Sequence, residues 1–189
     1  MTRLALVRHG QTDWIVEGRW QGQADPPLNE RGREQARQAA VSLRDCKLVA
    51  LYSSDLRRAL ETAQIIGAEV RLTPVPEPRL REIDLGAWQG RLSTEIQARY
   101  PDAYERWLRS PPTVQPPSGE TLTTLAVRVL GAVNEIIAST PQGMVGIVSH
   151  ELPIAVILCR SLGLGLEHVR DLTIKTGSWI EVVIDGALR

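Results

Sequence analysis

The chain has no phenylalanine, only two cysteines and no excess of either charge, because 22 basic residues balance 22 acidic ones. Nucleic acids and membrane surfaces are bound through a broad basic field, so we expect neither as a partner, and any anion site must be local. Cys46 and Cys159 lie far apart without metal-ligand spacing, and Cys159 follows an apolar run, which predicts a core thiol. We expect no metal and no cofactor. The lack of phenylalanine points to no function.

Long apolar runs are also missing near the start of the chain. Only Leu4 to Val7 precede Arg8, which is too short for a signal-peptide core or a membrane span and predicts a cytoplasmic protein. The 189 residues, 43% of them hydrophobic, are enough for a single domain over residues 1–189 with a sizeable core.

The apolar run of residues 4–7 is typical of a buried strand, and it ends at Arg8, His9 and Gly10. Arginine offers a planar fork of donors, and glycine lets main-chain N–H groups come close to a ligand, so this end is suited to an anion such as phosphate. Taken alone, the tripeptide more often marks only a turn. The long loop 14–28 brings Gln21 and Gly22 within reach of His9, although a surface loop pinned by its tryptophans is equally consistent.

The pattern of an apolar strand that ends in polar or basic residues occurs twice more. A second strand, 48–52, ends in Ser53–Asp55, an expected N-cap cluster, and the next helix has Arg57 and Arg58 in its first turn. A helix N-terminus already favours anions, so an arginine there adds to phosphate binding rather than to stability, and we expect one of the two to face the site. A strand over 143–148 ends at Ser149 and His150, with Ser149 expected to cap the helix 152–162, although a histidine there is more often structural.

Acidic residues in the glycine-rich segment 80–90 are candidates for a general acid. Glu82 and Asp84 lie among apolar residues, which would raise the pKa of a carboxyl group. Pairing of these carboxylates with Arg79 or Arg81 at the surface has equal weight.

Alternating strands and helices predict an α/β fold: a three-layer αβα sandwich with a largely parallel central sheet and a site beyond the carboxyl ends of its strands. The other expected elements are helices over 29–44, 94–108 (broken near Pro101) and 120–139, and a short strand at 72–75. The terminal segment 179–184 is expected to be an edge strand or a hairpin arm, and as an edge strand it could pair across a homodimer.

If the three strands are neighbours, two imidazoles and two guanidiniums meet at one point, which is costly unless an anion is bound there. A phosphoryl group fits, since positioned cations stabilise its charge without a metal. One histidine can then attack phosphorus, the other can donate hydrogen bonds, and Glu82 can protonate the departing alkoxide.

These residues carry a family resemblance that runs in order over roughly residues 3 to 152. The matching motifs are Arg8-His9-Gly10-Gln11-Thr12, Gly18-Arg19 through Gly22, Ser53-Ser54-Asp55-Leu56-Arg57-Arg58-Ala59, Leu80-Arg81-Glu82, Ser118-Gly119-Glu120 and Ser149-His150. Together they resemble the histidine phosphatase superfamily, the phosphoglycerate mutase-like proteins. The resemblance implies a phosphorylated nucleophile at His9, a phosphate pocket of Arg8, Arg58 and His150, a proton donor at Glu82, and substrate contacts at Gln21 and Gly22.

Two positions depart from the family pattern. Ile15 stands where members often have asparagine, and Glu151 where they often have glycine. A carboxylate at position 151 would repel a phosphate dianion and raise the pKa of His150, or it would sit in the first helical turn with its side chain outward, which we favour.

The short segment between Glu82 and the helix at 120 leaves little room for the extra lid of a mutase. The resemblance therefore favours a metal-independent phosphomonoesterase that acts through a phosphohistidine on a small phosphorylated metabolite, of the broad-specificity or α-ribazole phosphate type. The alternatives are a cofactor-dependent phosphoglycerate mutase and, given Ile15 and Glu151, a weakly active phosphoryl-ligand sensor.

Overall fold

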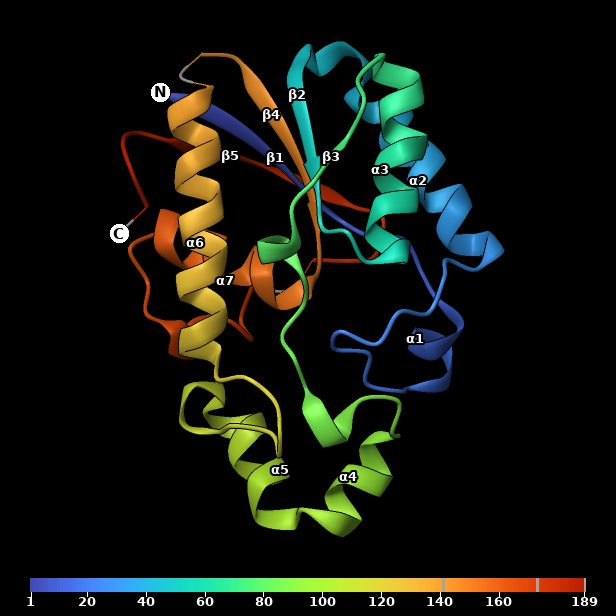
Figure 1. Ribbon diagram of the computed structural model, residues 1–189, viewed down its shortest axis with the longest axis vertical. Helices are drawn as coiled ribbons and strands as arrows, with labels where there is room; N and C mark the ends of the chain where they lie inside the picture. The colour runs from blue at the N-terminus through green and yellow to red at the C-terminus, as the bar shows by residue number, and fades with distance from the viewer. Residues whose placement is uncertain (141, 173, 189) are drawn as a thin grey trace.

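The computed structural model describes residues 1–140, 142–172 and 174–188. At the centre of the described residues is a five-stranded sheet of order β3-β2-β4-β1-β5 (Figure 1). The strands are β1 (Thr2–Arg8), β2 (Leu48–Ser53), β3 (Val75–Pro76), β4 (Met144–Ser149) and β5 (Trp179–Ile184). The first four run parallel, and β5 pairs antiparallel with β1 at the edge. The predicted largely parallel sheet is confirmed.

Helices cover both faces of the sheet. They are α1 (Asp13–Glu17), α2 (Glu30–Leu43), α3 (Arg57–Val70), α4 (Ser93–Arg99), α5 (Pro101–Arg109), α6 (Leu122–Ser139) and α7 (Glu151–Ser161). Figure 1 shows α2 and α3 on one face and α6 and α7 on the other, with α4 and α5 beyond one end of the sheet. The predicted three-layer sandwich is therefore confirmed, as is the helix break at Pro101.

Each face of the sheet has its own core. The amphipathic helix α6 buries Leu122, Leu125 and Val129 against the sheet, together with the apolar helix α7 that contains the buried Cys159. By length and composition alone α6 would pass as a membrane span, but this apolar stripe lies in the protein core. On the other face, α2 and α3 pack through small residues such as Ala39 and Ala63, which lets them lie close together.

The strand order places three polar strand ends side by side. β4 lies between β2 and β1, with Ser53 opposite Val148 and Arg8 opposite Ser149. The carboxyl ends of β1, β2 and β4 therefore meet at one edge, as the sequence predicts.

A close backbone contact fixes the turn after β1. A Cβ atom on Gly10 would lie 2.3 Å from the carbonyl oxygen of Gly32, and a Cβ on Gly32 would lie 2.1 Å from that of Gln11. Only glycine fits at both positions, so the first turn of α2 lies directly against the chain that follows His9.

Two predicted helix caps are wrong. The N-cap of α3 is Leu56, which forms no side-chain cap, and the Ser54 hydroxyl instead contacts His150. The Ser149 hydroxyl donates to the Leu80 carbonyl, and the N-cap position of α7 is His150. In both cases the serine hydroxyl forms a hydrogen bond with a residue from a distant segment.

Two element boundaries also differ. The predicted strand 72–75 is reduced to β3 over Val75–Pro76, because the chain turns at Arg71 in the left-handed region and Pro74 has no N–H to donate to a ladder. The predicted loop 14–28 overlaps the short helix α1, which Thr12 caps by accepting from the Ile15 N–H.

Candidate active site

His9 follows β1 and is only 2% exposed. Its Nδ1 lies 2.7 Å from the Gly10 carbonyl oxygen, so Nδ1 carries the proton, and Nε2 accepts a hydrogen bond of 3.2 Å from the Arg58 Nε. Burial, followed by the Arg58 charge, lowers the pKa of His9 well below its ordinary value. The ring is therefore neutral and presents a basic nitrogen at Nε2.

Arg58 is fully buried and joins His9 to the loop that follows α1. Its two terminal nitrogens donate to the carbonyl oxygens of Ala24 and Gly22, each at 2.7 Å. Burial lowers the pKa of Arg58 to about 10, so it stays charged at neutral pH. The neighbouring Arg57 is exposed, so only one of the pair faces the site, as predicted.

His150, at the end of β4, is fully buried and its ring centroid lies 5.0 Å from that of His9. Its Nε2 lies 2.8 Å from the Ser54 Oγ, which already accepts from the Leu56 N–H at 3.3 Å. The Nδ1 of His150 has no partner among the described residues, and it carries the ring proton when the Ser54 hydroxyl donates to Nε2. Such an N–H is a donor available to an anion.

Glu82 lies in the loop before α4, half-buried at the wall of the pocket. Its two oxygens face the N–H groups of Ile83 at 2.9 Å and Leu152 at 3.4 Å. Burial raises the pKa of Glu82, against the opposing effect of the Ile83 hydrogen bond. A carboxyl group that holds its proton at higher pH can act as a general acid.

Glu82 and Asp84 do not form the surface ion pairs with Arg79 or Arg81 that were the alternative prediction for this loop. Arg81 pairs with Asp55, and Arg79 pairs with Glu77 and Glu135. Asp84 accepts from the Gly86 N–H within its own turn, so it stabilises the loop.

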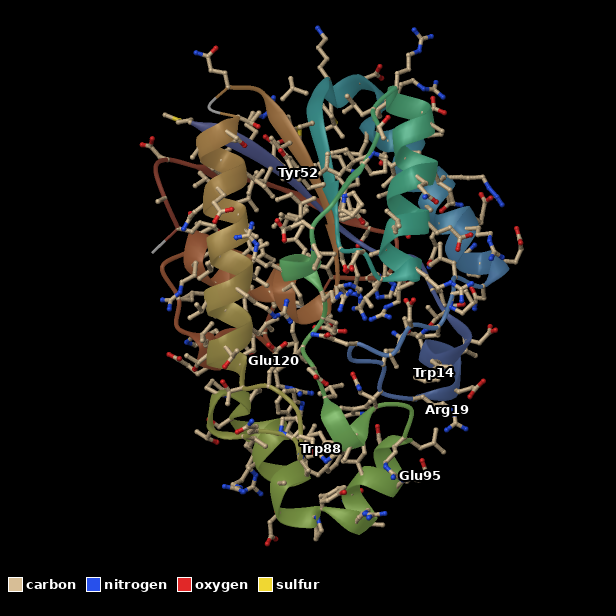
Figure 2. All side chains as sticks on the ribbon, viewed as in Figure 1. Trp14, Arg19, Tyr52, Trp88, Glu95 and Glu120 are labelled. Carbon is tan, nitrogen blue, oxygen red and sulfur yellow. The ribbon has the colours of Figure 1, made fainter. Side chains whose placement is uncertain are left out.

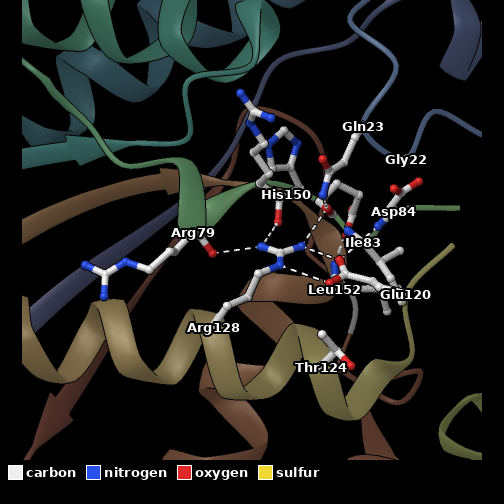
Figure 3. A network of polar contacts seen from close by, with 12 residues as sticks. Gly22, Gln23, Arg79, Ile83, Asp84, Glu120, Thr124, Arg128, His150 and Leu152 are labelled. Carbon is white, nitrogen blue, oxygen red and sulfur yellow. Dashed lines mark hydrogen bonds and ion pairs between the residues drawn. The ribbon is translucent and has the colours of Figure 1, made fainter. Parts of the chain in front are cut away.

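A residue that the sequence analysis missed holds this loop in place (Figure 3). Arg128, on α6, donates to the carbonyl oxygens of Arg79, Arg81 and Glu82 at 2.7 to 2.8 Å and pairs with Glu120. One guanidinium thus fixes the backbone that carries Glu82. A single arginine on an amphipathic helix is usually solvated, so no sequence signal singled it out.

Arg8 ends β1 and forms an ion pair with Glu151. Its two terminal nitrogens lie 2.6 Å from the Ile174 carbonyl oxygen and 2.6 Å from the Glu151 carboxylate. Glu151 is in the first turn of α7 as predicted, but the prediction of an outward side chain is wrong, because the partly buried Arg8 charge attracts it. The alternative, in which Glu151 raises the pKa of His150, does not hold either, since burial lowers that pKa.

Arg8, His9, Arg58, Glu82 and Glu151 border a cavity of about 280 Å³, whereas the fully buried His150 lies behind this lining, next to His9. The cavity lining includes Arg8, His9, Ile15, Arg19, Trp20, Gln21, Gly22, Arg58, Glu82, Ile83, Leu85, Trp107, Glu151, Leu152, Val169 and Arg170. Gln21 and Gly22 thus lie at the pocket, where the Gln21 side chain accepts from the Thr12 hydroxyl at 2.8 Å.

The tryptophans divide between pocket and core. Figure 2 shows Trp14 and Arg19 near α1 and Trp88 near α4. Trp88 is fully buried and packs edge-on against Trp20 and Trp107, both of which line the pocket. Trp20 and Trp107 can therefore contact a bound ligand, whereas Trp88 supports them from behind.

A family model described as "Histidine phosphatase superfamily (branch 1)" matches residues 4–188. Phosphoserine phosphatase 1 of Hydrogenobacter thermophilus is 38% identical over 166 residues, which are 88% of this chain and 79% of the relative. The probable phosphoglycerate mutase GpmB of Proteus mirabilis is 34% identical over 94% of this chain and 83% of its own length.

Solved structures agree with the fold. Bacillus stearothermophilus YhfR superposes with a TM-score of 0.94 at 34% identity, covering 99% of this chain and 93% of that one. A mycobacterial glucosyl-3-phosphoglycerate phosphatase in complex with VO₃ superposes with a TM-score of 0.88 at 37% identity, covering 95% and 91% of the two chains.

Proposed function

Since the chain belongs to the histidine phosphatase superfamily (branch 1), we propose that it is a phosphatase that hydrolyses a small phosphomonoester through a phosphohistidine at His9. The observation that carries this proposal is the state of the His9 ring. Its Nδ1 proton is held by the Gly10 carbonyl oxygen, so Nε2 keeps a lone pair for attack on phosphorus.

The first step transfers the phosphoryl group to the enzyme. His9 Nε2 attacks phosphorus, the P–O ester bond breaks, and the Glu82 proton goes to the departing oxygen to give an alcohol. Arg8 and Arg58 stabilise the charge on the phosphoryl oxygens, and the free Nδ1–H of His150 donates to one of them.

The second step returns the enzyme to its starting state. Water attacks phosphorus and gives a proton to the Glu82 carboxylate, the P–N bond breaks, and orthophosphate leaves. Every group in these two steps belongs to the chain or to water, so we propose a reaction that needs no metal or cofactor.

Hydrolysis fits this chain better than mutase chemistry. Only α4, α5 and a proline-rich connector separate Glu82 from α6, which leaves little sequence for a lid that excludes water. The relatives named as phosphatases support the same choice.

We also propose that residues 1–189 form one domain, that the protein is cytoplasmic, and that a homodimer, if formed, uses the outer edge of β5.

The test is transfer of ³²P from a labelled phosphomonoester, assayed with a chelator present. The chain is expected to release orthophosphate and to form an acid-labile, base-stable phosphoenzyme, and His9→Ala should lose both. The matched control is His168→Ala, because His168 is an exposed histidine that pairs with Asp171 and does not itself line the pocket, so the substitution should leave both signals intact. Binding of substrate without any covalent label would favour the sensor and contradict the proposal.

A further inference from the structure

We propose that Glu151 makes this phosphatase selective for phosphomonoesters that carry an ammonium group close to the ester oxygen. This inference rests on the function proposed above and concerns only which leaving group the pocket accepts. It starts from the residue after His150, where the chain departs from the family pattern.

The Glu151 carboxylate lines the pocket, and only one of its two oxygens has a partner among the described residues. Its Oε2 lies 2.6 Å from Arg8, the side chain is 41% exposed, and it borders the same cavity as His9 and Glu82. Its Oε1 forms no hydrogen bond with the described residues. A carboxylate oxygen that is open to the cavity can accept a further N–H donor.

The carboxylate also lies on the side where the alcohol leaves. The N–H of Leu152, the next residue, faces the Glu82 carboxylate at 3.4 Å, so the first turn of α7 touches the proposed proton donor. A substituent three bonds from the ester oxygen would thus lie near both Glu82 and Glu151.

Charge decides which substituent is favoured there. Glu151 offsets the Arg8 charge, so a second anionic group close to the ester gains little from Arg8 and is repelled by the carboxylate. An ammonium group offers three donors and the opposite charge. For a half-exposed pair we expect a preference of roughly fivefold, within the range of such ion pairs.

The experiment compares two substrates of the same shape, phosphoethanolamine and n-propyl phosphate, which differ by an ammonium group in place of a methyl group. The wild-type chain is expected to have the higher kcat/KM for phosphoethanolamine, and the ratio should fall as salt rises, because exposed pairs are screened. In Glu151→Gln the ratio should fall to about one while n-propyl phosphate is still hydrolysed. Glu151→Asp keeps the charge and should keep most of the preference.

Glu17→Gln is the matched control. Glu17 also pairs with a pocket arginine, Arg19, at 2.6 Å, but it does not itself line the pocket. Its loss removes the same charge and should leave the ratio unchanged.

A wild-type ratio at or below one, or a ratio that survives Glu151→Gln, would overturn this inference while leaving the phosphatase in place. Failure to hydrolyse either substrate or p-nitrophenyl phosphate would instead reject the proposed function, and with it the inference.

Discussion

The proton positions on the two histidines are set by short contacts from the backbone and from one serine. Gly10 fixes the Nδ1–H tautomer of His9, and a Ser54 hydroxyl that donates to Nε2 gives His150 the same tautomer, but the nitrogen without a protein hydrogen-bond donor or acceptor on His150 is Nδ1. The two rings therefore present different faces: a lone pair at His9 and an N–H at His150. This difference suits a nucleophile and an oxyanion donor at neighbouring positions.

Ser54→Ala should disturb this arrangement without touching the proposed nucleophile. Loss of the hydroxyl removes about 1–3 kcal/mol of hydrogen-bond free energy, and we expect kcat/KM to fall by roughly 5- to 100-fold. The ¹⁵N chemical shifts of His150, which distinguish the two tautomers, should change with it.

Ser149→Ala is the comparison, because it also removes a buried serine hydroxyl, one that donates to the Leu80 carbonyl oxygen at 2.7 Å. Unchanged His150 shifts in Ser54→Ala would contradict the role given to this serine.

At the scale of elements, the polar ends of β1, β2 and β4 could be placed from sequence because each apolar run stops at a distinctive turn. The contacts of Arg128, Ser54 and Glu151 could not, because each depends on a segment far along the chain. Arg128 reaches the loop before α4, and Glu151 turns to a strand end more than 140 residues away. Sequence patterns predict elements, while side-chain direction depends on tertiary packing.

Gly32→Ala tests how α2 supports the His9 turn. Its new Cβ would lie 2.1 Å from the Gln11 carbonyl oxygen, so the helix must shift, which costs roughly 1–3 kcal/mol. Both the free energy of unfolding and the phosphatase activity should fall.

Gly131→Ala in α6 is the matched control, since its new methyl group meets nothing within 4 Å. It should stabilise the protein by about 1 kcal/mol, the gain expected inside a helix. If urea denaturation gives the two variants the same free energy of unfolding, the contact between α2 and the His9 turn does not contribute to stability.

For the molecule as a whole, the buried site makes stability depend on pH. The pKa values of His9 and His150 are lowered in the folded state, so their stabilising effect is present above about pH 6.5, the value in an unfolded chain. It is lost as the pH falls, because the unfolded chain then binds more protons. Glu82 acts in the opposite direction, since its raised pKa favours proton uptake on folding.

Urea denaturation between pH 7.5 and pH 5.5 should therefore show a falling free energy of unfolding. Two histidines set an upper limit of about 2.7 kcal/mol per pH unit, and Glu82 reduces it. In Glu82→Gln this opposing effect is absent, so the fall should become steeper. A free energy of unfolding that stays constant over this range would contradict the lowered histidine pKa values.

The packing of Trp88 against Trp20 and Trp107 gives the protein a built-in optical signal. Two of these indoles border the cavity and share the third as a neighbour, so a molecule that displaces water from the cavity changes the surroundings of both. Intrinsic fluorescence can therefore follow the filling of the cavity in real time, without a label and without turnover.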